Sequence, residues 1–145
     1  MKPLVAGMRH GLAAAEWLAG RGYPELGPVI AGHPVTRLAD GEWFDEWLAT
    51  ASTEALVVSY ADKRAGQRLE SMAGRFAAWE RRYPPEVRAG TARGAWDAET
   101  LAAVRVRAAV LEARVCDMAG VAADEVRRLS WTARALQSAG EGSAP

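Results

Sequence analysis

Two histidines and one short charged stretch are the parts of this sequence with the clearest capacity for chemistry. The histidines are His10 and His33, and the charged residues Asp62, Lys63 and Arg64 end an apolar run that begins at Ala55. Imidazole nitrogens and carboxylate oxygens are common metal ligands, and lysine and arginine bind phosphate groups. A metal ion and a phosphate could be held together if the fold brought these residues to one place.

Asp62 is the residue whose expected position requires a partner for its charge. On a helix it shares a face with Ala55 and Val58, so a buried helix would carry it toward the interior or its rim. A buried carboxylate costs several kcal/mol unless a cation, a metal or a set of donors compensates it. Lys63 and Arg64 do not face Asp62 on a helix and are expected at a pocket rim. A metal, a cation and a helix N-terminus all remain open as its partner.

The two histidines each allow a structural interpretation beside the chemical one. His10 lies on the side of its expected helix that also carries Ala14 and Trp17, away from the main apolar stripe. There it either packs against another element or points into a pocket. His33 precedes Pro34 at the expected end of a short helix, where an imidazolium suits the helix dipole.

Several function classes lack their usual signals in this sequence. There is no His-x-x-x-His, Cys-x-x-Cys, Gly-x-Ser-x-Gly or Walker-type phosphate loop. Eighteen Lys and Arg balance eighteen Asp and Glu, so nucleic acid and acidic membranes are not expected as partners, and a small molecule is. A lone Cys116 and a start without a long apolar run fit a cytoplasmic location.

The elements that must position these residues are all predicted to be helices. Apolar spacing and Gly or Pro breaks predict helices over 4–20, a short one closing near His33, one around Trp43 to Trp47, one over 54–64 buried nearly all round, and one ending at Pro84-Pro85. No segment alternates with period two for long enough to predict a strand. The fold class is therefore all-α.

The C-terminal part predicts two more helices. The first is expected to stop at Gly120. Its apolar residues form a stripe with nearly heptad spacing: Leu101, Val104, Ala108, Leu111, Val115 and Met118. The stripe is expected to be a core face within the chain, and a dimer seam is the less favoured interpretation. The second is expected from about Ala123. We predict a domain over 1–84, a helical extension over 85–138 packing on the same core, and a disordered tail over 139–145.

Two stretches together resemble the HD-domain superfamily of metal-dependent phosphohydrolases. They are "RHGLAAAEWLAGRGYPELGPVIAGHP" and "EALVVSYADKRAGQRLESMAGRFAAWERRYP", and the resemblance covers roughly residues 2 to 84. In similar members a helix begins with a His before a small-residue and Glu pattern, a turn leads to a second His, and a buried helix ends in Ala-Asp. The matching positions are His10, Glu16, His33 and Asp62.

The resemblance implies an orthogonal helical bundle around a divalent ion such as Mn, Mg or Fe. Asp62 would be the final metal ligand, and His10 and His33 would bind a second metal, the phosphate or the attacking water. The implied reaction is hydrolysis of a phosphomonoester or phosphodiester, including nucleotides, by metal-activated water. Lys63 and Arg64 would help to hold the phosphate.

The sequence departs from the family pattern at its start. It contains no His-Asp dipeptide, and of the core ligands implied by the resemblance only Asp62 has a match. Lys2 and Pro3 resemble residues that follow the dipeptide, so the bundle is expected to be N-terminally truncated. A missing front part, a second chain that supplies it, and a decayed domain remain as explanations. The alternative function is a non-catalytic helical module that binds a partner or forms a homodimer.

Overall fold

Short polar side chains and one glycine fix the ends of the helices. The computed structural model describes residues 6–66, 68–82 and 96–129. Asp40, Ser52 and Asp97 each precede a helix and accept a hydrogen bond from the backbone N–H three residues later. Gly120 ends the longest helix with φ 65°, a left-handed conformation that glycine adopts without strain.

Helices make up the whole regular structure of the described residues, which confirms the all-α prediction. Apart from them, this part of the chain has only an isolated bridge between Ala65 and Leu69. The elements in chain order are α1 (Ala6–Gly20), η1 (Pro24–Leu26), α2 (Gly27–Ala31), η2 (Val35–Ala39), α3 (Gly41–Thr50), α4 (Thr53–Arg64), α5 (Met72–Arg82), α7 (Ala98–Ala119) and η3 (Val126–Arg128). None of the described helices is long and apolar enough to cross a membrane.

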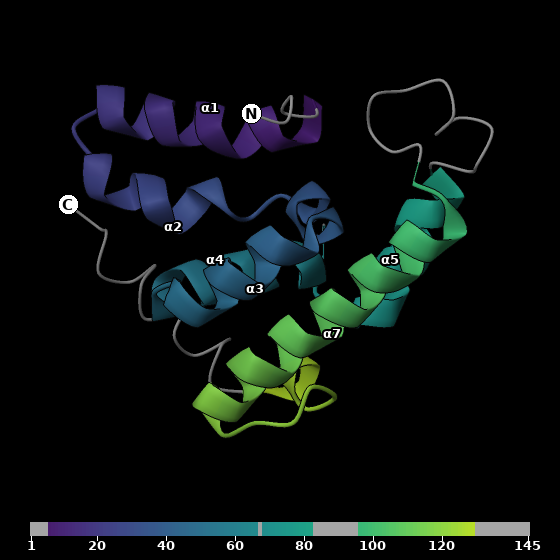
Figure 1. Cartoon of the computed structure of the whole chain (residues 1–145). Coiled ribbons are helices and arrows are strands. Elements are labelled where there is room, and N and C mark those ends of the chain that lie inside the picture. Colours follow the sequence, from purple (N-terminus) through teal and green to yellow (C-terminus); the bar gives the residue numbers. More distant parts are fainter. Residues whose placement is uncertain (1–5, 67, 83–95, 130–145) are drawn as a thin grey trace.

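The helices pack in a chain of contacts that runs from α1 to α7. Figure 1 shows α1 and α2 side by side on one flank and α7 running obliquely on the other, with α3 and α4 between them. Helix α2 packs on α4, α4 packs on α7, and α5 contacts both α4 and α7. Helix α4 therefore lies between the histidine-bearing helices and the long C-terminal helix.

A single apolar cluster joins these elements. The stripe of α7 turns inward, with Val104, Ala108 and Leu111 fully buried, so it forms core within the chain as expected. Met118 at the end of the stripe is 41 % exposed. The other buried members of the cluster come from η2 through α5 and from the end of α7: Leu38, Phe44, Leu56, Tyr60, Met72, Phe76, Val115 and Cys116.

Two predictions about the helices are wrong. Helix α4 is not buried all round, because Val57 and Ala61 face solvent while Leu56, Ser59 and Tyr60 face the core. No α-helix begins at Ala123 within the described residues, where the chain forms a turn and the short helix η3 instead. The predicted Pro84-Pro85 stop and the tail 139–145 lie outside the described residues.

Candidate functional site

His10 and His33 meet at the contact between α1 and the turn after α2. Their Nε2 atoms are 3.0 Å apart, and the two rings meet edge to face with centroids 4.8 Å apart. His33 is buried, whereas His10 is exposed at its end of the pair. The pair is therefore open to solvent from the α1 side and anchored in the protein on the other side.

Gly11 is the residue that allows this approach. A Cβ atom there would lie 2.4 Å from the carbonyl oxygen of Ala31 and 3.0 Å from the ring of Pro34. Any side chain at this position would push α1 away from the turn that carries His33. Sequence reasoning missed this role, although the His-Gly dipeptide on a helix is a visible signal for close packing.

A backbone carbonyl determines which nitrogen of His33 carries hydrogen. The Nδ1 atom of His33 lies 2.6 Å from the carbonyl oxygen of Ile30, which can only accept a hydrogen bond. Nδ1 therefore donates, and in the neutral ring the Nε2 atom presents its lone pair to His10. Metal-binding histidines are typically oriented in this way by a carbonyl or carboxylate on the other ring nitrogen.

Lys63, on α4, holds the backbone of the same turn. Its Nζ donates to the carbonyl oxygen of His33 at 2.8 Å, to the carbonyl oxygen of Ser59 at 3.1 Å and to Ser59 Oγ at 3.0 Å. These acceptors use all the donors of one ammonium group. Burial lowers the pKa of Lys63 from 10.5 to about 8, and the nearby charge of Asp62 partly opposes this shift.

Arg64 does not lie at a pocket rim as predicted, because it points into the opposite side of α4. The side chain is 2 % exposed, and Nη1 donates to Glu112 Oε2 at 2.7 Å and to the Tyr60 hydroxyl at 2.5 Å. The backbone carbonyls of Glu70 and Ala123 accept further hydrogen bonds from it. Its guanidinium is thus bonded within the core and not presented to a ligand.

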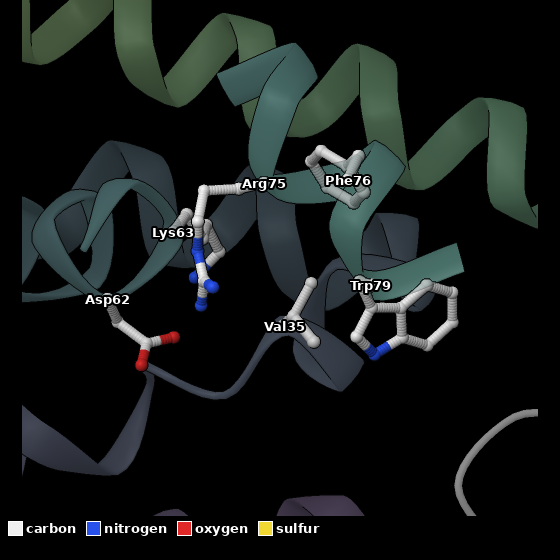
Figure 2. Close-up of a pocket in the computed structure, with 6 residues that line it drawn as sticks. All are labelled: Val35, Asp62, Lys63, Arg75, Phe76 and Trp79. Carbon is white, nitrogen blue, oxygen red and sulfur yellow. The ribbon is translucent and has the colours of Figure 1, made fainter. Parts of the chain in front are cut away.

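Asp62 was expected in the interior or at its rim, and of these the interior is wrong, because the residue lies on the exposed side of α4. The cause is the orientation of α4, which turns Ser59 and Lys63 toward the core and Ala61 and Asp62 toward solvent. Asp62 lines a pocket of about 80 Å³ with Val35, Lys63, Arg75, Phe76 and Trp79 (Figure 2). Arg75 was missed, although it shares a helix face with the apolar Met72 and Trp79.

The structure thus brings together two of the predicted metal ligands. Among the described residues, no group of three or more His, Cys, Asp or Glu side chains is arranged to hold a metal ion. His10 and His33 meet, but they are not among the residues that line the pocket of Asp62. Glu16 lies on the exposed side of α1. Trp43 and Trp47 stack on each other against the core.

Comparison of the chain with protein-family models, with curated proteins and with solved structures gives no match.

Proposed function

We propose that this chain is a divergent relative of the HD-superfamily phosphohydrolases, with His10 and His33 supplying two ligands of a divalent metal site. The reaction of such a site is hydrolysis of a phosphomonoester or phosphodiester. The observation that carries the proposal is the 3.0 Å separation of the two Nε2 atoms. Two nitrogens bound at right angles to one ion, each about 2.1 Å from it, would lie roughly 3.0 Å apart.

The environment of the pair supports the same use. The carbonyl of Ile30 fixes His33 in the tautomer whose Nε2 lone pair points toward His10, where an ion between the two rings would accept it, and Lys63 holds its backbone. The exposed His10 leaves a path for an ion and a substrate from solvent. A divalent ion at such a site lowers the pKa of bound water and neutralises phosphoryl charge.

The fit to a metal is partial. The pair suits two neighbouring positions around an ion, and the described residues provide no complete group of three ligands. The proposal therefore requires further ligands from outside the described residues or from a second chain. Asp62 is the final ligand that the family pattern predicts, but it forms no complete ligand group with the histidine pair among the described residues.

Calorimetric titration with Mn²⁺ tests the proposal on the wild-type chain and on His10→Ala and His33→Ala. Removing an orienting partner of a metal ligand weakens affinity about 10–100-fold, so removal of a ligand itself is expected to weaken Mn²⁺ binding at least about tenfold. Glu16→Ala, an exposed change on the same helix as His10, is the matched control and should leave affinity unchanged.

Two further results complete the test. Asp62→Ala tests whether Asp62 is a metal ligand. If this substitution weakens Mn²⁺ binding as much as the histidine substitutions do, Asp62 belongs to the metal site. The proposal is wrong if the wild-type chain does not bind Mn²⁺, or if both histidine variants bind Mn²⁺ as tightly as the wild-type chain. Hydrolysis of bis(p-nitrophenyl) phosphate in the presence of Mn²⁺ then measures whether a metal-loaded chain is active by itself.

A second candidate is a non-catalytic helical binding module. It is favoured by the exposed side of α7, where Val106 is 63 % and Val110 43 % exposed. The lack of a complete ligand group among the described residues also favours it. Absent Mn²⁺ binding together with concentration-dependent self-association would support this function over hydrolysis.

A further inference from the structure

The pocket beside Lys63 contains two opposite charges that do not neutralise each other. Arg75 on α5 and Asp62 on α4 both line it, yet more than 4.0 Å separates the nearest nitrogen of Arg75 from the oxygens of Asp62. Figure 2 shows the guanidinium of Arg75 and the carboxylate of Asp62 pointing toward the same space. The pocket is thus positive at one side and negative at another.

Arg75 lacks partners among the described residues. Its Nε atom is shielded from solvent and has no hydrogen-bond acceptor. The side chain of Arg75 lines the pocket and has no acceptor among the described residues, so a ligand oxygen that reaches its guanidinium from the pocket would be stabilising. The planar fork of a guanidinium matches the two oxygens of a carboxylate.

The other cation of the pocket does not compete for the ligand. The ammonium of Lys63 already donates three hydrogen bonds, one to the carbonyl oxygen of His33 and two to oxygens of Ser59. Asp62, by contrast, is exposed and has no hydrogen-bond or ion-pair partner among the described residues. One unpaired cation and one unpaired anion are therefore left to meet a ligand.

The remaining wall is apolar. Phe76 is buried, Val35 is half-buried, and the ring of Trp79 packs against Trp96 with centroids 5.4 Å apart. The space of about 80 Å³ has room for a group of a few carbon atoms. Such a wall favours a short hydrocarbon side chain.

We propose that this pocket binds a free α-amino acid with a short apolar side chain such as that of valine. The ligand carboxylate pairs with Arg75, its ammonium pairs with Asp62, and its side chain lies on Val35, Phe76 and Trp79. Asp62 would repel a phosphate dianion, and Arg75 would repel a simple amine, so the charges together select a zwitterion. This site shares no residue with the histidine pair. Asp62 is the one residue that the family pattern also assigns to the metal, so L-valine binding is measured on metal-free protein.

Titration of the ¹⁵N-labelled chain with L-valine, isovalerate and isobutylamine tests this inference. The last two compounds are valine without its amino group and without its carboxylate. The Trp79 indole N–H signal, assigned with Trp79→Phe, reports binding. L-valine is expected to shift it and to bind at least about tenfold more tightly than either analogue, the effect of one charge-assisted hydrogen bond.

Charge-removing variants complete the test. Arg75→Gln and Asp62→Asn are each expected to weaken L-valine binding about tenfold or more. Arg81→Gln, on the same helix but exposed, and Asp45→Asn, exposed on α3, are the matched controls and should bind like the wild-type chain. If Arg75→Gln fails to fold by circular dichroism, Arg75→Lys replaces it and should bind more weakly, because lysine lacks the planar fork.

Three outcomes would overturn the inference. They are no shift of the Trp79 signal at millimolar L-valine, equal binding of isovalerate or isobutylamine, and unchanged L-valine binding by Asp62→Asn. Equal binding of isovalerate would identify a plain anion site instead. Because L-valine binding does not require Mn²⁺, its loss leaves the test of the histidine pair unaffected.

Discussion

Lys63 and Arg64 are neighbours in the chain, both are buried, and their surroundings differ completely. Arg64 faces α7, where the carboxylate of Glu112 and the hydroxyl of Tyr60 meet its guanidinium. Lys63 faces α2, where only neutral oxygens of His33 and Ser59 accept its hydrogen bonds. One side of α4 neutralises its buried charge, and the other side only solvates it.

The difference separates a structural region from a region suited to binding. The Arg64 cluster is not open to a ligand, because its charges pair with each other within the core. The same contacts hold Tyr60, and burial raises the pKa of its hydroxyl. The Lys63 side lies beside the histidine pair and lines the pocket of Asp62 and Arg75. Both proposed sites use the side of α4 on which buried charge is not neutralised and accessible space lies nearby.

Breaking the ion pair on the Arg64 side should produce the largest effect. Glu112→Ala leaves a guanidinium buried without its counter-charge, which is expected to lower the free energy of unfolding by about 3–5 kcal/mol. Urea denaturation followed by circular dichroism measures the loss. A loss below about 1 kcal/mol would show that water or another group compensates Arg64, and the contrast between the two regions would disappear.

The lowered pKa of Lys63 predicts that the difference between the Lys63 and Arg64 sides of α4 appears in the pH dependence of stability. Between pH 8 and pH 10.5 the folded chain loses this proton while the unfolded chain keeps it. The unfolded state then binds more protons, so the free energy of unfolding rises with pH in this window. We expect a rise of about 2 kcal/mol from pH 8 to pH 10 in the wild-type chain relative to Lys63→Met.

Urea denaturation of both proteins at each pH measures this rise. Tyr60 and the other titrating groups are present in both, so their contribution cancels in the difference. A difference between wild type and Lys63→Met that stays flat with pH would mean that Lys63 is as well stabilised in its charged form as Arg64.

The smallest effect is expected at the surface pair of Arg105 and Glu80. Both side chains are substantially exposed, 45 % and 31 %, although they form an ion pair of the same chemical type as Arg64 and Glu112. Exposed pairs contribute about 0–1 kcal/mol, so Glu80→Ala should hardly change the urea midpoint. A loss as large as that of Glu112→Ala would show that burial does not determine what these pairs contribute.

Much of the helical framework was predictable from local sequence. Apolar spacing predicted the core stripe of α7, and the glycine at position 120 predicted its end. These features depend on residues within a few positions of each other. The same reasoning failed at Ala123, where a run of helical spacing forms a turn and a short 3-10 helix in the described part.

The candidate sites were predictable only in part. The histidines were identified by residue type, and the structure places them in contact, but only the tertiary structure shows that Gly11 lies against Ala31 and Pro34 and so makes the contact possible. Asp62 was expected in the interior or at its rim, and it is exposed beside a pocket. Arg75 was overlooked because an arginine in an amphipathic helix normally belongs to the solvated face.

The sequence alone determined the helical class of the described chain, the capping of its helices and the apolar stripe of α7, because each depends on local hydrogen bonding and on periodicity. Only the tertiary structure decided which side of α4 faces the core. A rotation of one helix by a single residue position exchanges Asp62 for Lys63 in the interior. That rotation is set by the packing of Leu56, Ser59 and Tyr60 against distant elements, so no local pattern specifies it.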